Sequence, residues 1–380
     1  MRVAIVGAGP GGLSAAYALE RAGIESRILE RADRVCSSWY GHYRGLQLNS
    51  PRWLSSLPGA PMGREMGEWV PRERFLRYVT DYAGRLRTEP ELGVEVERIE
   101  RDPSGWRLAT SAGEIAAPAV VVATGLNARA HWPEWPGRET FTGELLHVAD
   151  YVEPARYRGR SVLVVGIGAS GMDVAVELAR AGVETRVAVR STPVFFRRHA
   201  STAILAQTMK HARLPDWFVD PASLLTHRLV FGDLSDIGLS SPRSGMATAQ
   251  KQRGHGGTID RGLVSAARAG AISIVPAVDG FDGPDVLLAD GSRLAADVVI
   301  AATGQRTSLE PLVGHLGVLG PDTRPVVHGG RTAPGAPGLF FIGYRIPPGQ
   351  LGDMRPDSRA IARRVAKLVG ARRSGSIRAR

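Results

Sequence analysis

The stretch Val3-Ala4-Ile5-Val6-Gly7-Ala8-Gly9-Pro10-Gly11-Gly12 decides the fold, because an apolar run leads directly into a glycine-rich loop. This G-x-G-x-x-G pattern, placed between a strand and an amphipathic helix, is typical of a dinucleotide-binding βαβ unit. The first glycine makes a tight turn, the second lets the backbone approach a pyrophosphate, and the third lets the helix pack on the strand. The helix then presents free N–H groups and its positive dipole end to the phosphates.

The same pattern occurs a second time. The loop Gly166-Ile167-Gly168-Ala169-Ser170-Gly171 follows the apolar run Val162-Leu163-Val164-Val165 and precedes another amphipathic segment. One such loop is weak evidence, but two loops in full strand–helix context indicate two nucleotide sites in one chain.

The residue after the next strand of each unit predicts which nucleotide binds. The strand at 26–29 ends at Glu30, and an acid at this place accepts hydrogen bonds from a ribose diol and disfavours a 2′-phosphate. The strand at 185–189 is followed by Arg190, which we place at the equivalent position and whose guanidinium suits a 2′-phosphate. We therefore expect FAD or NAD at the first loop and NADPH at the second. The alternatives are a solvated strand end for Glu30 and a surface arginine for Arg190.

The two halves of the chain repeat one plan, which predicts an α/β fold with two Rossmann-like domains. Buried strands lead into Ala123-Thr124-Gly125 in the first half and into Thr303-Gly304 in the second. A further buried strand at 339–344 and a helix at about 357–369 close the chain. We expect a discontinuous FAD domain at 1–152 and 305–380. An inserted NADPH domain at 153–304 carries a helical insertion around 193–257.

Composition excludes several classes of function. The net charge of the 380 residues is +11, and nearly all of the basic residues are arginine. These arginines do not alternate with aromatic residues in the pattern typical of a nucleic-acid groove. Cys36 is the only cysteine, so no disulfide framework is possible, and the histidines lack the spacing of metal ligands. The first strand begins almost at Met1 and no apolar run is long enough for a bilayer. We expect a cytoplasmic protein without metal, and the sequence leaves open whether it forms a homo-oligomer.

The segment from Phe141 to Tyr151 matches F-x-G-x-x-x-H-x-x-x-(Y/F), just before the second loop. With the two loops, it resembles the class B flavoprotein monooxygenases, specifically the flavin-containing monooxygenases. Other segments resemble their YUCCA-like branch: Phe231-Gly232-Asp233-Leu234, Gly238-Leu239, Pro242 and 258–262. Two departures are Gln305 in place of Tyr, and Ser37-Ser38-Trp39 in place of Gly-Gly-x-Trp.

The resemblance implies a glutathione-reductase-like layout and assigns roles to many residues. Glu30 would hold the adenosine ribose, the Val96 backbone the adenine edge, and Trp39 would cover part of the flavin. Gly343 and the turn Gly349-Gln350-Leu351 would place a helix N-terminus near the flavin's pyrimidine edge. The remaining residues expected to contact FAD or NADPH are Gly7, Gly9, Pro10, Gly12, Arg31, Ala123, Thr124, Gly125, Gly166, Gly168, Ser170, Gly171, Arg190, Thr303 and Gly304.

The resemblance also implies a chemistry. In this family reduced FAD reacts with O₂ to give a C4a-hydroperoxyflavin, which oxygenates a substrate while NADP⁺ stays bound. Asn49 would donate a hydrogen bond to the peroxide, or is a plain loop residue before a turn. His147 would lie at the domain junction and affect how well NADPH oxidation is coupled to oxygenation. The alternative is a buried histidine with a structural role.

Several reactions are compatible with this reading. We expect oxygenation of a nitrogen or sulfur atom in a small molecule, with oxidative decarboxylation of an arylpyruvate as an alternative. A Baeyer–Villiger reaction is disfavoured, because Tyr151 stands where that branch has Trp. A disulfide oxidoreductase needs a cysteine pair that the chain lacks. A non-oxygenating flavin redox protein is the alternative from another class.

Overall fold

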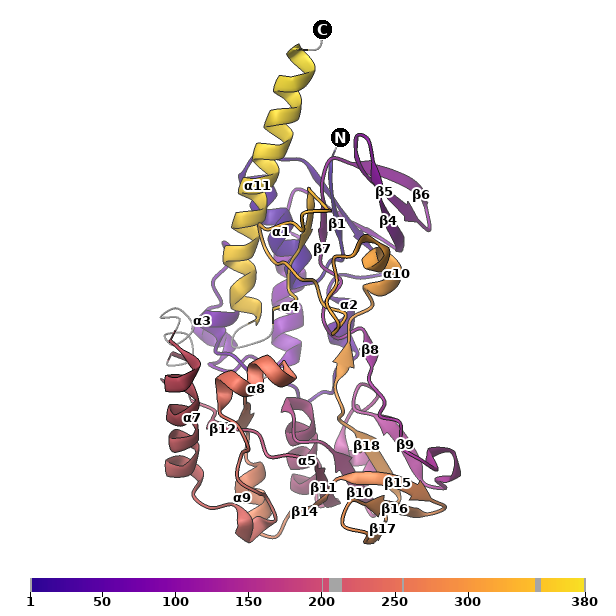
Figure 1. The fold of residues 1–380 in the computed structure, drawn as a ribbon, viewed down its shortest axis with the longest axis vertical. Coiled ribbons are helices and arrows are strands. Elements are labelled where there is room, and N and C mark those ends of the chain that lie inside the picture. The colour runs from indigo at the N-terminus through magenta and orange to yellow at the C-terminus, as the bar shows by residue number, and fades with distance from the viewer. Residues whose placement is uncertain (1, 200, 205–213, 255, 346–349, 379–380) are drawn as a thin grey trace. The chain divides into compact units, whose positions relative to one another are not determined.

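The computed structural model describes residues 2–199, 201–204, 214–254, 256–345 and 350–378. The chain forms two compact units (Figure 1). The first unit comprises residues 1–41, 50–129 and 305–380, and the second comprises residues 42–49 and 130–304. Residues 42–49 and 130–152, which the sequence analysis assigned to the first domain, thus belong to the second unit.

The first unit is built on a parallel sheet with the strand order β20-β7-β1-β2-β3. Every residue of β1, β7 and β20 is buried, as expected for strands covered on both faces. This confirms the α/β fold class. The strands are β1 (Val3–Val6), β2 (Ser26–Glu30), β3 (Pro90–Leu92), β7 (Val120–Val122) and β20 (Leu339–Phe341).

Helices α1 (Pro10–Arg21) and α11 (Gln350–Arg378) pack side by side in this unit (Figure 1). The final helix is longer than the predicted segment 357–369, because it already begins at Gln350. Strands β5 and β6 form an antiparallel hairpin, and β4 extends it to three antiparallel strands. The other elements of the unit are α2 (Ser37–Tyr40), α3 (Arg52–Ser55), η1 (Arg64–Met66), α4 (Arg72–Ala83), β4 (Val96–Asp102), β5 (Gly105–Thr110), β6 (Gly113–Ala117), β19 (Gln305–Arg306), α10 (Glu310–Val313) and η5 (Gly314–Leu316).

The second unit repeats this plan in a parallel sheet with the order β14-β11-β10-β18-β9. In both sheets the strand before the glycine loop is central, and the strand after the loop's helix lies beside it. The fifth strand differs in origin: β20 comes from near the end of the chain, whereas β9 comes from the Phe141–Tyr151 segment. The strands are β9 (Glu144–His147), β10 (Ser161–Val165), β11 (Glu184–Val189), β14 (Ser273–Pro276) and β18 (Val298–Ala301).

The insertion expected at 193–257 is helical only in part. Its helices α7 (Asp216–Phe231) and α8 (Met246–Arg253) pack together, while β12 (Phe195–Arg197) pairs in parallel with β13 (Thr258–Asp260). The other elements of the unit are α5 (Ala169–Arg180), α9 (Leu263–Arg268), η2 (Arg138–Thr140), η3 (Pro154–Tyr157), η4 (Ser235–Ile237), β15 (Val278–Asp282), β16 (Asp285–Leu288) and β17 (Arg293–Ala295). Strand β8 (Arg129–Ala130) lies at the boundary of the two units. No helix among the described residues combines the length and apolar character needed to cross a bilayer.

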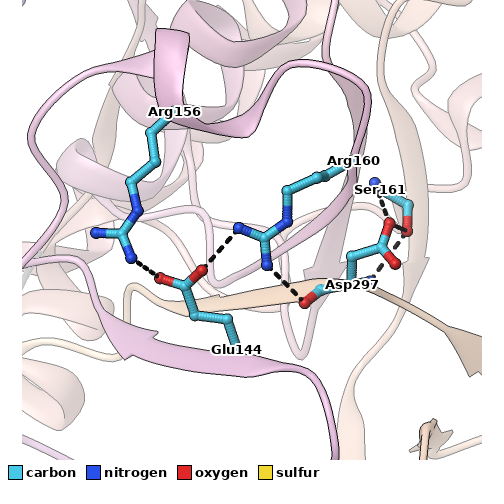
Figure 2. A network of polar contacts seen from close by, with 5 residues as sticks. All are labelled: Glu144, Arg156, Arg160, Ser161 and Asp297. Carbon is cyan, nitrogen blue, oxygen red and sulfur yellow. Dashed lines mark hydrogen bonds and ion pairs between the residues drawn. The ribbon is translucent and has the colours of Figure 1, made fainter.

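A polar network holds β9, β10 and β18 together at the ends where these strands begin (Figure 2). Glu144 accepts hydrogen bonds of 2.7 Å from both Arg156 and Arg160. The Asp297 carboxylate accepts from the N–H of Ser161 at 2.7 Å and from its hydroxyl at 2.8 Å. The network is partly exposed, so it fixes strand ends more than it contributes stability.

Gly143 lies just before β9, at a point where neighbouring atoms come close to its backbone. A Cβ atom on Gly143 would lie 2.6 Å from the ring of Phe141 and 2.9 Å from the carbonyl oxygen of Ala296. Phe141 itself packs on the ring of Phe281, with 5.0 Å between ring centroids. The glycine of the motif therefore has a steric role in seating β9 on the sheet.

We predict that Gly143→Ala destabilises the protein by about 1–3 kcal/mol, because neither the ring nor the carbonyl can move away without disturbing the sheet. The free energy of unfolding from urea denaturation measures this change. Gly335→Ala is the matched control, since a Cβ atom there meets nothing within 4 Å. Equal stability of the two variants would contradict the steric role of Gly143.

Candidate functional site

The two glycine loops have the same geometry. Gly7 and Gly166 both have φ of +105°, a backbone conformation that favours glycine. A Cβ atom on Gly12 would lie 1.9 Å from the carbonyl oxygen of Gly7, and one on Gly171 would lie 2.1 Å from that of Gly166. The first and third glycines of each loop are therefore required by the protein's own packing.

The second glycine of each loop faces open space instead. A Cβ atom on Gly9 or on Gly168 would meet nothing within 4 Å. Each residue is the N-cap of the following helix, α1 or α5, and neither helix has a side-chain hydrogen bond at its cap. Both loops thus combine free space with uncapped helix N–H groups, which is the arrangement that a pyrophosphate requires. Pro10 and Ser170, which are expected to contact the cofactors, lie at the start of these helices.

Glu30 lies at the end of β2, buried beside the first loop. Its carboxylate accepts hydrogen bonds from the N–H of Ala8 at 2.8 Å and from the N–H of Ala32 at 3.1 Å. Bonds from these two backbone N–H groups hold the carboxylate at the strand end. Glu30 is thereby fixed where a ribose diol would be recognised, whereas Arg31 is exposed and lies 3.9 Å from Glu95.

The predicted equivalence of Arg190 and Glu30 is wrong by one position. In the first unit Val6 pairs with Leu29, and in the second unit Val165 pairs with Ala188. The residue equivalent to Glu30 is therefore Val189, and Arg190 is the exposed residue after it. The place of Glu30 is thus taken in the second unit by Val189, an apolar residue that does not repel a phosphate. The guanidinium of Arg190 follows one position later.

The segment Ala123-Thr124-Gly125 is tied to a residue that the sequence analysis did not select. The N–H of Ala123 bonds to the Val6 carbonyl at 2.8 Å, so the turn begins beside the first loop. The buried hydroxyl of Tyr344 accepts the N–H of Thr124 at 3.0 Å and lies 2.8 Å from its hydroxyl. Only the three-dimensional fold brings Tyr344 to this turn, because it is far away in sequence.

His147 stands at the end of β9 with both ring nitrogens engaged. Nδ1 accepts the N–H of Ala149 at 3.1 Å, so Nε2 carries the proton and donates to the Gly304 carbonyl at 3.1 Å. Thr303 bonds through its hydroxyl to the His131 carbonyl at 2.5 Å. Burial lowers the pKa of His147, which keeps the ring neutral. These contacts agree with the structural interpretation of His147.

The other residues expected to hold FAD lie at separate places in the first unit. Trp39 in α2 packs on Phe75 with 4.4 Å between ring centroids, and Val96 is the first residue of β4. The Gly343 carbonyl accepts a bond of 2.5 Å from Gln350, which begins α11, and Leu351 is buried. Gly349, the first residue of the predicted turn, lies outside the described residues.

Asn49 ends the segment 42–49, which belongs to the second unit. The Asn49 side chain is exposed, while the residues before it are anchored. Tyr43 donates to Asp173 in α5 at 2.6 Å, and Arg198 donates to the Gln47 side chain at 2.7 Å. The sequence analysis selected neither Asp173 nor Arg198, because no motif signals either contact.

Comparisons with known proteins agree with this geometry. Residues 4–214 match the pyridine nucleotide-disulphide oxidoreductase family. The probable indole-3-pyruvate monooxygenase YUCCA3 of Arabidopsis thaliana is 33% identical, over 90% of this chain and 81% of its own length. The indole-3-pyruvate monooxygenase YUCCA8 of Oryza sativa subsp. japonica is 34% identical, over 90% of this chain and 85% of its own.

Solved structures show the same similarity. A flavin-containing monooxygenase from Stenotrophomonas maltophilia has a TM-score of 0.73 at 26% identity and covers 97% of this chain and 98% of its own. The bacillithiol disulfide reductase of Bacillus cereus has a TM-score of 0.70 at 19% identity, covers 96% of this chain and 98% of its own, and is similar in fold alone. A dithiol reaction is excluded here, because Cys36 is the only cysteine and burial raises the pKa of its thiol.

We predict that the two open glycines separate the two cofactors. Gly9→Val fills the space beside the first loop and yields folded, colourless protein without flavin. Gly168→Val keeps the flavin, which dithionite still reduces, but NADPH no longer reduces it. Flavin absorbance and anaerobic reduction measure both outcomes, and circular dichroism checks folding. Full flavin content in folded Gly9→Val would rule out the first loop as the FAD site.

Proposed function

The chain belongs to the flavin-dependent monooxygenases, enzymes that contain FAD and use NADPH, and we propose how it divides the two cofactors between its loops. FAD binds at Gly7–Gly12 of the first unit and NADPH at Gly166–Gly171 of the second. FAD, when bound, would supply the redox and oxygen chemistry. The protein's residues bind, orient and exclude water.

One observation carries this assignment. The first glycines of the two loops have the same φ value, and the second glycines face the same open space. The loops alone therefore do not distinguish FAD from NADPH. The difference lies at the end of the next strand, where Glu30 is held by backbone N–H groups in the first unit and Val189 stands, followed by Arg190, in the second. An acid selects a free ribose diol, whereas an arginine without a neighbouring acid suits a 2′-phosphate.

We propose Asn49 as a hydrogen-bond donor to the oxygen that is being activated. A side-chain amide donates without changing charge, and such a donor stabilises developing negative charge on oxygen when it is held in place. His147 has a different part: its neutral ring joins the end of β9 to the Thr303-Gly304 turn beside the second loop. It therefore supports the site and does not transfer a proton.

The proposed reaction is oxygenation of a nitrogen or sulfur atom of a small molecule. Tyr151, the last residue of the motif, is fully buried and packs on Tyr157, so its role is in core packing.

A second candidate reaction is oxidative decarboxylation of a 2-oxo acid. It is favoured by the names of the curated relatives, which are indole-3-pyruvate monooxygenases at 31–35% identity.

We predict that Arg190→Ala weakens NADPH binding roughly tenfold to a hundredfold, because a charge-assisted hydrogen bond contributes about 1.5–3 kcal/mol. The affinity for NADH should stay nearly unchanged, since NADH has no 2′-phosphate. Titration of the flavoprotein with both nucleotides measures this difference. Arg158→Ala is the control: it removes an equal charge from an exposed residue that precedes β10, at the opposite end of the sheet. Equal losses for both nucleotides would contradict the role of Arg190.

A substrate panel tests the reaction itself. Purified flavoprotein is supplied with NADPH and O₂ together with amines, sulfides, ketones or arylpyruvates, and each product is identified by mass spectrometry. We expect NADPH-dependent oxygen insertion, either at nitrogen or sulfur or with loss of CO₂ from the 2-oxo acid. NADPH consumption that yields only hydrogen peroxide across the panel would favour the non-oxygenating redox protein.

A further inference from the structure

We propose that Arg198, together with Arg261 and Asp173, is a positioning group that fixes Asn49 relative to helix α5, the helix that begins at the NADPH loop. Its effect is on how fast the NADPH-reduced enzyme releases hydrogen peroxide in air, relative to the rate of flavin reduction. This inference rests on the proposed function of Asn49, and every contact that carries it lies within the second unit.

The segment before Asn49 is held by two arginines. Arg198 donates through Nη1 to the Gln47 side-chain oxygen at 2.7 Å and through Nη2 to the Leu48 carbonyl at 3.3 Å. Arg261 also reaches the Gln47 oxygen, at 3.4 Å. The Leu48 carbonyl belongs to the peptide bond that joins Leu48 to Asn49. One fork-shaped guanidinium therefore fixes both the side chain and the backbone that lead into Asn49.

The two arginines come from neighbouring strands. β12 and β13 are paired in parallel with Arg197 opposite Asp260, so Arg198 and Arg261 both leave this strand pair at its end. Two cations placed together need anionic or strongly dipolar partners. Gln47 is shared between them, and Asp173 forms an ion pair with Arg261.

Asp173 connects this cluster to α5. It lies just after the first turn of the helix, and its carboxylate also accepts the hydroxyl of Tyr43 at 2.6 Å. The side chains of Arg261 and Asp173 are only 12% and 6% exposed, so solvent screens their interaction little. A continuous chain of contacts thus runs from α5 through Asp173, Arg261, Gln47 and Arg198 to the peptide bond before Asn49.

The placement has a functional consequence. A hydrogen-bond donor assists a reaction only while it stays within a few tenths of an ångström of its productive position. Asn49 is exposed, so its own packing does not fix it, and the anchored residues before it do. Loss of the anchor should leave the nucleotide loops intact and release electrons as hydrogen peroxide.

The test compares four single variants and one double variant of the FAD-loaded, full-length protein. Arg198→Met removes both donors with a side chain of similar length, and Arg198→Lys restores one charged donor. Arg197→Met is the matched control, because Arg197 is the exposed neighbour on β12. Asn49→Leu serves as the reference for complete loss of the amide.

Two rates are measured for each protein: anaerobic flavin reduction by NADPH, and hydrogen peroxide release with NADPH in air. We expect the ratio of peroxide release to reduction to rise severalfold in Arg198→Met, as in Asn49→Leu. The ratio should be intermediate in Arg198→Lys and equal to wild type in Arg197→Met. The double variant Asn49→Leu/Arg198→Met should be no worse than Asn49→Leu, because Arg198 acts through Asn49.

Two results would overturn the inference: a wild-type ratio in Arg198→Met, or additive effects in the double variant. If Arg198→Met fails to fold, Gln47→Leu removes the shared acceptor instead and must raise the ratio in the same way. A wild-type protein whose flavin is not reduced by NADPH would refute the proposed function itself. Normal wild-type reduction with unaffected variants would refute only the positioning role.

Discussion

The contact between the third glycine of each loop and the carbonyl of the first is the constraint on which both units depend. At 1.9 Å and 2.1 Å, the hypothetical Cβ atoms of Gly12 and Gly171 would overlap the carbonyl oxygens of Gly7 and Gly166. Any side chain there would separate helix from strand and close the space above the second glycine. Packing inside the protein and room for a pyrophosphate are thus set by the same contact.

Local sequence patterns predicted the parts of the fold that depend on local interactions. Both loops and the buried strands around them follow from apolar runs and glycine spacing, and all are present. The prediction that Arg190 is equivalent to Glu30 was wrong by one residue. Composition indicates roughly where a strand ends, but the pairing of strands sets which residues are equivalent. Val189 is apolar like the strand before it, so nothing in the sequence marked it as the counterpart of Glu30.

Contacts between distant segments account for what the sequence could not predict. Tyr344 reaches Thr124 and β9 joins β18 only because parallel strands bring distant segments to neighbouring positions. Segment 42–49 leaves the first unit for the second, although it is flanked on both sides by residues of the first. The arginines that anchor this segment come from the ends of β12 and β13, and arginine is so common in this chain that composition gives no signal.

The repeat also indicates where the reaction chemistry must lie. The two sheets share strand order, loop geometry and helix placement, so the shared scaffold can bind two nucleotides but cannot give them different tasks. Differences must come from residues without a counterpart in the other unit. Glu30 against Val189 and Arg190 is one such difference, and we propose that it distinguishes a free ribose diol from a 2′-phosphate. The other is segment 42–49 together with strands β12 and β13, whose ends carry the arginines that anchor it; the described residues of the first unit include no equivalent of this arrangement. Asn49 therefore stands where the repeat breaks, which is where a duplicated scaffold acquires a function that neither copy has alone.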